Sequence, residues 1–114
     1  MKAPIRDPGF YLTTSSVNGG FSIKFANNYT VSVRWGSGSY ADQITDGYDF
    51  IGDLNAQTAE VGVWRELDNG PIEWYHVDGF DYDGDDVLPR LESEHVAEIM
   101  WKVANLPIWK GNND

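Results

Sequence analysis

Residues 21–40 read FSIKFANNYTVSVRWGSGSY, and two runs of strict alternation within this stretch decide the fold. The apolar residues of the two runs are Phe21, Ile23 and Phe25, followed by Tyr29, Val31, Val33 and Trp35. A period of two matches the alternating side-chain directions of a half-buried strand. The stretch therefore predicts a β-hairpin.

The length of the turn follows from the phase of the two runs. Residues that pair directly across a hairpin share a face of the sheet. A two-residue turn at Asn27 and Asn28 would set Phe25 opposite Thr30 and put the apolar faces out of phase. A three-residue loop instead pairs Phe25 with Tyr29, and it leaves Asn28 in the left-handed conformation, which Asn tolerates better than most residues. The pairs expected to follow are Ile23 with Val31 and Phe21 with Val33.

The length and composition predict one α+β domain. The chain has 114 residues, of which 41% are hydrophobic and 14% aromatic, enough for a single core. It has no cysteine, which excludes a disulfide framework and thiol catalysis and fits a cytosolic protein. Residues 1–20 contain no long apolar run, so we expect neither a signal peptide nor a membrane span. We expect an N-terminal arm over these residues, with an edge strand or a crossing segment at 10–12 and a turn at 18–20.

A second hairpin is expected from residues 58–67 and 71–77, joined by Asp68-Asn69-Gly70. The same phase argument gives a three-residue loop with Gly70 in the left-handed position. The expected pairs are Val63–Tyr75, Val61–Val77 and Arg65–Glu73 on one face, with Trp64–Trp74 and Gly62–His76 on the other. Two tryptophans on the nominally outer face are either buried by residues 1–20 or 40–56, or exposed as a binding patch. Tryptophan with a polar rim is a common composition of interface hot spots.

A C-terminal helix is expected from about residue 93 to residue 105, before Pro107. Ser93 is the expected N-cap, because its hydroxyl can accept a hydrogen bond from a free backbone amide. One apolar stripe is expected to face the sheet, formed by Val96, Ile99, Met100, Val103 and Leu106. The predicted fold is thus a mostly antiparallel sheet, built from two hairpins, with one C-terminal helix packed on one face.

The charge is strongly and unevenly negative. The net charge is −10, from 18 acidic and 8 basic residues, and no basic residue occurs in 42–53 or 66–86. Such a field repels nucleic acid and anionic membranes and attracts basic protein surfaces, although solubility alone is the simpler explanation. Acidic loops are expected at 41–56 and 78–90. The candidate protein-binding residues are Asp42, Asp46, Asp49, Asp53, Trp64, Trp74, Asp78, Asp81, Asp83, Asp85 and Asp86.

The acidic loop does not match a calcium-binding EF-hand. Aligning Gly84 with the glycine of that pattern puts Gly79 and Arg90 at the two anchoring ligand positions. A weak cation site of another kind remains an alternative to a solvated loop, and we predict no metal and no cofactor. His76 and His95 lie on different elements, and no motif places a serine near either of them, so we predict no enzymatic activity.

A small-ligand site is the alternative. The glycine-rich residues 36–39 resemble a phosphate-binding loop only weakly, because they lack the lysine of a P-loop. Together with neighbouring side chains they are the candidate site of a nucleotide-signal sponge. The residues of this alternative are Arg34, Trp35, Gly36, Gly38 and Tyr40.

Residues 20–25 (GFSIKF), 28–33 (NYTVSV) and 35–40 (WGSGSY) form a pattern together with 58–64 (TAEVGVW) and 95–99 (HVAEI). This pattern resembles small acidic proteins encoded by bacteriophages, and the resemblance brings no catalytic residues with it. It implies the cytoplasm of an infected bacterium, where such proteins often bind and block host proteins.

These observations predict a phage accessory protein that binds and inhibits a host protein, for example one of a defence complex. Its carboxylates would take the place of nucleic-acid phosphates on a basic host surface. We expect no direct contact with nucleic acid or membrane, and the sequence leaves homo-oligomers open. A virion or assembly component is a further alternative.

Overall fold

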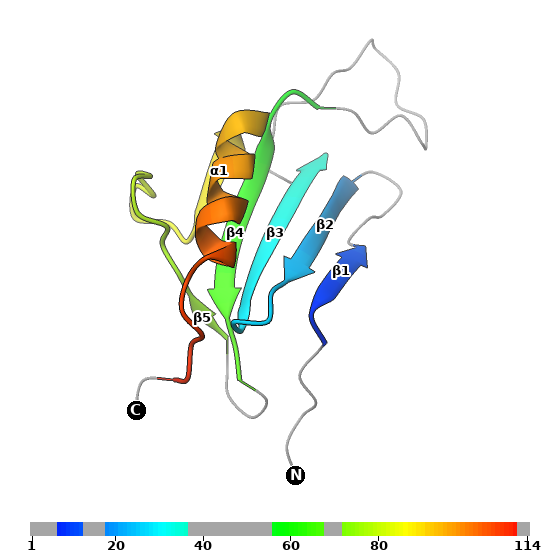
Figure 1. Cartoon of the computed structure of the whole chain (residues 1–114). Coiled ribbons are helices and arrows are strands. Elements are labelled where there is room, and N and C mark those ends of the chain that lie inside the picture. The colour runs from blue at the N-terminus through cyan, green and yellow to red at the C-terminus, as the bar shows by residue number, and fades with distance from the viewer. Residues whose placement is uncertain (1–6, 13–17, 37–55, 68–71, 112–114) are drawn as a thin grey trace.

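A computed structural model describes residues 7–12, 18–36, 56–67 and 72–111 of the chain (Figure 1). It contains a six-stranded antiparallel sheet and one C-terminal helix, which confirms the predicted α+β fold. The strands are β1 (Gly9–Leu12), β2 (Asn18–Lys24), β3 (Tyr29–Gly36), β4 (Ala59–Arg65), β5 (Glu73–Trp74) and β6 (Val87–Leu91), and the helix is α1 (Ser93–Ala104). The strand order is β1-β2-β3-β4-β5, and β6 also pairs with β4. No helix in the described ranges is long and apolar enough to cross a membrane.

The first hairpin, β2–β3, has the predicted register. Phe21 pairs with Val33 and Ile23 pairs with Val31. The N–H of Phe25 donates to the carbonyl of Tyr29 at 2.9 Å, which closes a three-residue loop. The φ angle of Asn28 is 75°, which is the predicted left-handed conformation. The predicted register and loop length of this hairpin are therefore confirmed.

The beginning of the chain differs from the sequence prediction in one place. Residues 18–20 were expected to form a turn, but they belong to β2, where Gly19 pairs with Trp35. A Cβ on Gly19 would lie 2.5 Å from Nε1 of that indole, so the ring lies directly on the glycine backbone. The glycine thus provides room for a cross-strand tryptophan. The expected edge strand at residues 10–12 is present as part of β1, which pairs with β2.

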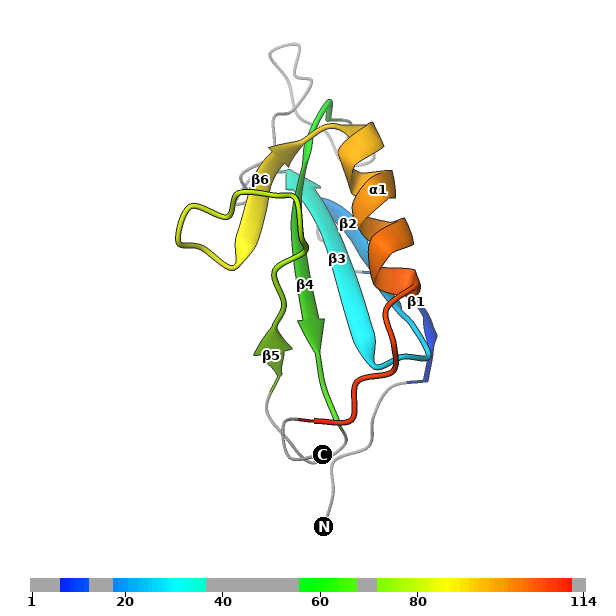
Figure 2. The same cartoon turned by 60° about the vertical axis from the view of Figure 1, so that its left-hand side comes forward.

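The core lies between α1 and the two central strands. The helix crosses one face of the sheet above β3 and β4 (Figures 1 and 2). Ile99 and Val103 of the helix are completely buried, as are Val31 and Val63 of the strands beneath them. These side chains belong to the predicted apolar stripe and to the predicted inner face. Their burial is the main source of stability, at about 1.5–3 kcal/mol for each aliphatic side chain.

The prediction for the second hairpin is correct only for the pairs closest to the expected turn. Trp64 pairs with Trp74 and Arg65 pairs with Glu73, as predicted. The N–H of Tyr75 still donates to the carbonyl of Val63 at 2.9 Å, but β5 has then ended. The predicted pairs Val61–Val77 and Gly62–His76 are wrong, because Val61 pairs with Leu88 and Gly62 with Val87. β6 was not expected from the sequence, and this strand occupies the place beside β4 that the prediction gave to residues 76–77.

The bounds of α1 agree with the prediction, but its N-cap does not. Ser93 is the first helical residue and not the N-cap, which is Glu92, and no side chain there forms a capping hydrogen bond. The Ser93 hydroxyl donates instead to Oε1 of Glu94 at 3.0 Å. At the other end, the side-chain amide of Asn27 donates to the carbonyl oxygens of Val103 and Leu106, at 2.8 and 3.0 Å. The turn of the first hairpin therefore holds the C-terminus of the helix.

Candidate protein-binding surface

Two tryptophans lie side by side on the sheet face opposite the helix. Trp64 and Trp74 are cross-strand partners, and each alternates with residues that point toward the core. Their ring centroids are 5.7 Å apart at an interplanar angle of 76°, an edge-to-face arrangement. Trp74 is 40% exposed and Trp64 is half-buried. Of the two interpretations, the described residues therefore favour an accessible patch, with Trp74 as its more open member.

The indole of Trp74 lies on the backbone of Gly62. A Cβ on that glycine would be 3.1 Å from Cζ3 of Trp74 and 3.7 Å from Cγ2 of Val87. Gly62 and the two indoles line a cavity of about 340 Å³, which we call the tryptophan groove. The groove is lined by Ser32, Arg34, Glu60, Gly62, Trp64, Ile72, Trp74 and Val87. Its walls are aromatic and aliphatic, and its far end is charged.

The charged end of the groove is formed by Arg34 and Glu60, which are opposite each other on β3 and β4. Arg34 is exposed and Glu60 is half-buried. Since residues of opposite parity in a strand point to opposite faces, Trp35 lies on the helix side of the sheet. The small-ligand alternative requires Arg34 and Trp35 to contact the same ligand, and their positions on opposite faces argue against this. Arg34 instead lines the same groove as Trp64 and Trp74, which was not predicted from the sequence.

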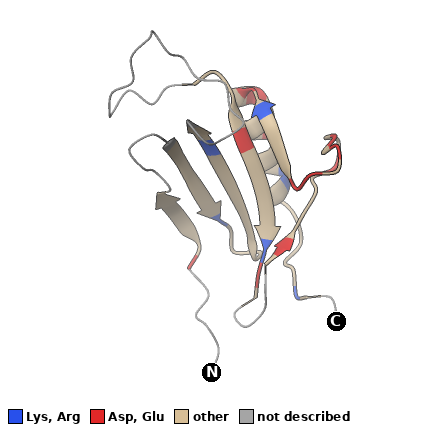
Figure 3. Ribbon diagram, turned by 180° about the vertical axis from the view of Figure 1, so that it is seen from behind, with Lys and Arg blue, Asp and Glu red and all other residues tan. Residues whose placement is uncertain are grey.

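The acidic loop, residues 78–86, is folded and projects from the side of the sheet formed by β4–β6 (Figures 2 and 3). The N–H of Asp83 donates to Oδ1 of Asp81 at 2.9 Å, and the N–H of Asp86 donates to Oδ1 of Asp85 at 2.7 Å. Asp83 and Gly84 have positive φ angles, of 51° and 81°. These local turns use one oxygen of a carboxylate and leave its charge in solvent. Exposed carboxylates are those of Asp78, Asp81, Asp83 and Asp85, whereas Asp86 is half-buried.

Tyr82 anchors the acidic loop to the domain. Its side chain is only 7% exposed, and its hydroxyl accepts a hydrogen bond from the N–H of Val77 at 2.9 Å. Burial raises the pKa of Tyr82, although the bond from Val77 opposes this effect. The imidazole of His76 stacks on the phenol at 4.0 Å and lies 2.9 Å from Oδ1 of Asp86. The role of Tyr82 was not predicted, since a tyrosine among five aspartates has no apolar periodicity.

A lysine connects the acidic loop to the helix. Nζ of Lys102 donates to the backbone carbonyl of Asp78 at 3.0 Å and lies 3.0 Å from Oε2 of Glu98. It also lies 5.5 Å from the centroid of the Phe80 ring, within the range of a cation–π contact. The loop is thus fixed to the domain at its start by Lys102 and in its middle by Tyr82.

Arg65 has a structural role. It forms the predicted ion pair with Glu73, with Nε 2.7 Å from Oε1, so Glu73 does not contribute a free charge. The guanidinium lies over the rings of Tyr29, Tyr75 and Trp109 at 4.9–5.8 Å. Burial acts to lower the pKa of Arg65, but hydrogen bonds to Tyr29 and Glu73 outweigh it, and the pKa is raised. Through Trp109, this cluster attaches the C-terminal segment to the end of β4.

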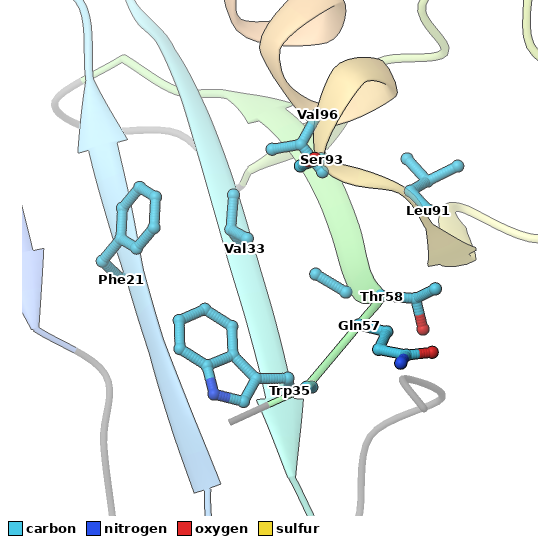
Figure 4. Close-up of a pocket in the computed structure, with 10 residues that line it drawn as sticks. Phe21, Val33, Trp35, Gln57, Thr58, Leu91, Ser93 and Val96 are labelled. Atoms are coloured by element: carbon cyan, nitrogen blue, oxygen red, sulfur yellow. The ribbon is translucent and has the colours of Figure 1, made fainter. Parts of the chain in front are cut away.

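On the helix side, Trp35 lines a second cavity, of about 290 Å³ (Figure 4). In this view Phe21, Val33 and Trp35 rise from the sheet toward Val96 and Ser93 at the start of α1. The cavity is mostly apolar, with Gln57 and Thr58 at its rim. Of the described residues of the small-ligand alternative, Trp35 lines this cavity and Arg34 does not, and Gly36 is the last residue of β3.

Several candidate residues cannot be placed. Asp42, Asp46, Asp49, Asp53, Gly38 and Tyr40 lie outside the described residues. Within the described part of the chain, no three His, Asp or Glu side chains are grouped so as to hold a metal ion. No protein-family model matches the chain, and no curated protein or solved structure is significantly similar to it. Its function therefore has to be inferred from this surface.

Proposed function

We propose that this protein is a non-enzymatic accessory protein that binds a basic surface of another protein through the tryptophan groove and the acidic loop. The observation that carries the proposal is their adjacency. Val87 lines the groove and directly follows Asp86, the last residue of the loop. Exposed indole and exposed carboxylates thus share one side of the molecule. This combination suits a partner rich in lysine and arginine.

The two parts would contribute in different ways. The carboxylates of the acidic loop raise the association rate, because a field of one sign steers an oppositely charged partner. The Debye length is about 8 Å at physiological ionic strength, so this steering weakens with added salt. The indoles act at short range: a desolvated cation over a tryptophan face gains about 2 kcal/mol, which chiefly slows dissociation.

We further propose that the partner is a nucleic-acid-binding protein of a bacterial host and that binding inhibits it. The resemblance to small acidic phage proteins supports this setting. The exposed Asp81, Asp83 and Asp85 follow one another at every second residue, and their carboxylates are suited to occupy sites made for phosphates. The arrangement favours this hypothesis over a nucleotide-signal sponge, since Arg34 and Trp35 lie on opposite faces of the sheet.

The test is affinity capture from a lysate of infected bacteria, followed by elution in a salt gradient. The decisive variant is the double substitution Asp83→Asn and Asp85→Asn. Asparagine keeps the acceptor oxygen that the Asp85 turn uses, and it tolerates the positive φ angle at residue 83, so the charge changes without loss of the fold. The control is Glu92→Gln with Glu94→Gln, which removes the same charge from the start of α1 on the other side of the sheet.

We expect the captured partner to elute at lower salt from the loop variant and unchanged from the control. Trp74→Ala should release the partner faster at every salt concentration, because the indole contact is not screened. The proposal is wrong if the loop variant and the control behave alike, or if elution of the wild-type complex does not depend on salt.

A further inference from the structure

The first strand of the sheet presents apolar side chains that no other described part of the chain covers. Phe10 and Leu12 of β1 are each 80% exposed, and they pair with Ile23 and Phe21 of β2, which are half-buried. All four lie on the helix side of the sheet, since paired residues share a face. The helix, however, contacts β3 and β4 and leaves these two strands open (Figure 1). Within the described ranges, no element covers this apolar surface.

The same strand is also an edge without the usual protection. Proteins protect the edge strands of sheets with charged residues, proline or bulges, because an unprotected edge strand can pair with another chain. At the other side of the sheet, β6 contains Pro89, Arg90 with a φ angle of 55°, and a bulge opposite β4, while β5 has only two residues. By contrast, β1 reads GFYL and has neither a charge nor a proline. Among the strands that the structure describes, β1 is thus the edge that lacks these features.

The distribution of charge decides what can pair there. Among the described residues, Asp7 is the only acidic residue before Glu60, and the rest lie on or next to β4, β5 and α1 or in the acidic loop (Figure 3). Four strand spacings separate β1 from β5. At about 4.8 Å each, this is about 19 Å, more than twice the Debye length of about 8 Å at physiological ionic strength. Two copies joined at β1 would therefore hold their acidic loops apart, whereas contact through β5 or β6 would bring them together.

We propose that β1 pairs antiparallel with β1 of a second copy of this chain, which joins the two sheets across a two-fold axis. Residues opposite each other must share a face, so the axis passes through a residue and not between two. An axis at Phe10 would set Leu12 opposite Pro8, which has no N–H to donate. An axis at Tyr11 pairs Phe10 of each copy with Leu12 of the other. The four exposed side chains then cover one another between the two helices.

This dimer would present two tryptophan grooves and two acidic loops at opposite ends of one continuous sheet. Such an arrangement favours a partner with repeated basic sites, because the second contact becomes intramolecular. The pairing itself does not depend on the proposed function, since it rests on residues that the protein-binding surface does not include.

The first test is sedimentation velocity of the full chain from about 1 μM to about 500 μM, the range in which a small interface dissociates. The wild type should pass from monomer to dimer, and added salt should tighten the dimer by screening the remaining repulsion. Phe10→Lys and Leu12→Lys should each weaken dimerisation by at least about tenfold. The matched control is Trp101→Lys, at an aromatic position on α1 that is 70% exposed.

A second test reports the register and does not depend on the stability of the lysine variants. The chain has no cysteine, so Tyr11→Cys introduces a single thiol. On the proposed axis its Cα would lie about 4.5–5.5 Å from that of its mate, within the range of a disulfide. We expect mild oxidation to give a covalent dimer from this variant and none from Trp101→Cys. A monomer at every concentration, an equal effect of Trp101→Lys, or no cross-link at residue 11 would each overturn the proposal.

Discussion

Replacing Asn27 with alanine should lower the free energy of unfolding by about 2 kcal/mol. In the wild type, Nδ2 of Asn27 donates to the carbonyls of Val103 and Leu106, and its Oδ1 accepts a longer bond from the N–H of Tyr29 at 3.2 Å. A helix leaves its last carbonyls without partners inside the helix, so this amide serves as a tertiary C-cap. Two good bonds at about 1 kcal/mol each account for the estimate, since the third is long.

The measurement is urea unfolding followed by tryptophan fluorescence and by circular dichroism. A loss of 2 kcal/mol should lower Tm by about 8 °C in a domain of this size. Asn27→Asp should destabilise more than alanine, because it keeps the acceptor for Tyr29 but sets a negative charge against two carbonyls at the negative end of the helix dipole. Asn105→Ala is the control: its amide donates to Trp101 at 2.8 Å in an exposed position, where little should be lost.

Either of two results would contradict the proposed role of Asn27. One is an Asn27→Ala variant that unfolds within about 0.5 kcal/mol of the wild type, the usual range for surface substitutions. The other is an aspartate variant more stable than the alanine variant.

Three further outcomes are expected. Gly62→Ala should displace the indole of Trp74, since the new Cβ would lie 3.1 Å from Cζ3, and it should shift the tryptophan emission and weaken partner binding with little change in fold. Tyr82→Phe should cost about 1–3 kcal/mol in urea unfolding, because it leaves the N–H of Val77 buried without its acceptor. Burial raises the pKa of Tyr82 above its ordinary value of 10.0, so the folded state holds this proton more tightly than the unfolded chain does. The contribution of this group to the free energy of unfolding is therefore fully present below pH 10. It is lost as the pH rises through the pKa of the folded state. Urea midpoints from neutral to strongly alkaline pH should therefore fall less steeply in Tyr82→Phe than in the wild type.

Local pattern was sufficient for the first hairpin and for the buried stripe of the helix. In both cases each residue's neighbours in the sequence determine the face it occupies, and one register alone brings Phe25 and Tyr29 to the same side. The Trp64–Trp74 pair followed in the same way. This is why the central part of the candidate surface was predicted from the sequence.

The other features depend on contacts between distant parts of the chain. β6 contains Pro89 and follows a run of aspartates, both typical of a loop, and its strand conformation requires the bulge opposite Ala59 and Val61. The partners of Asn27 lie 76 and 79 residues further along the chain, beyond any local signal. Likewise, Arg34 reaches the tryptophans only because β4 lies beside β3.

The position of the helix over one half of the sheet has a consequence for amide hydrogen exchange. Amides of β3 and β4 lie beneath α1, and they should exchange only through global unfolding, at the full free energy of the domain. Those of β1 should exchange through fraying of the edge, at a much lower free energy. The slowest-exchanging unit would thus comprise the two middle strands and the helix, and association at the edge would be visible as slower exchange confined to β1.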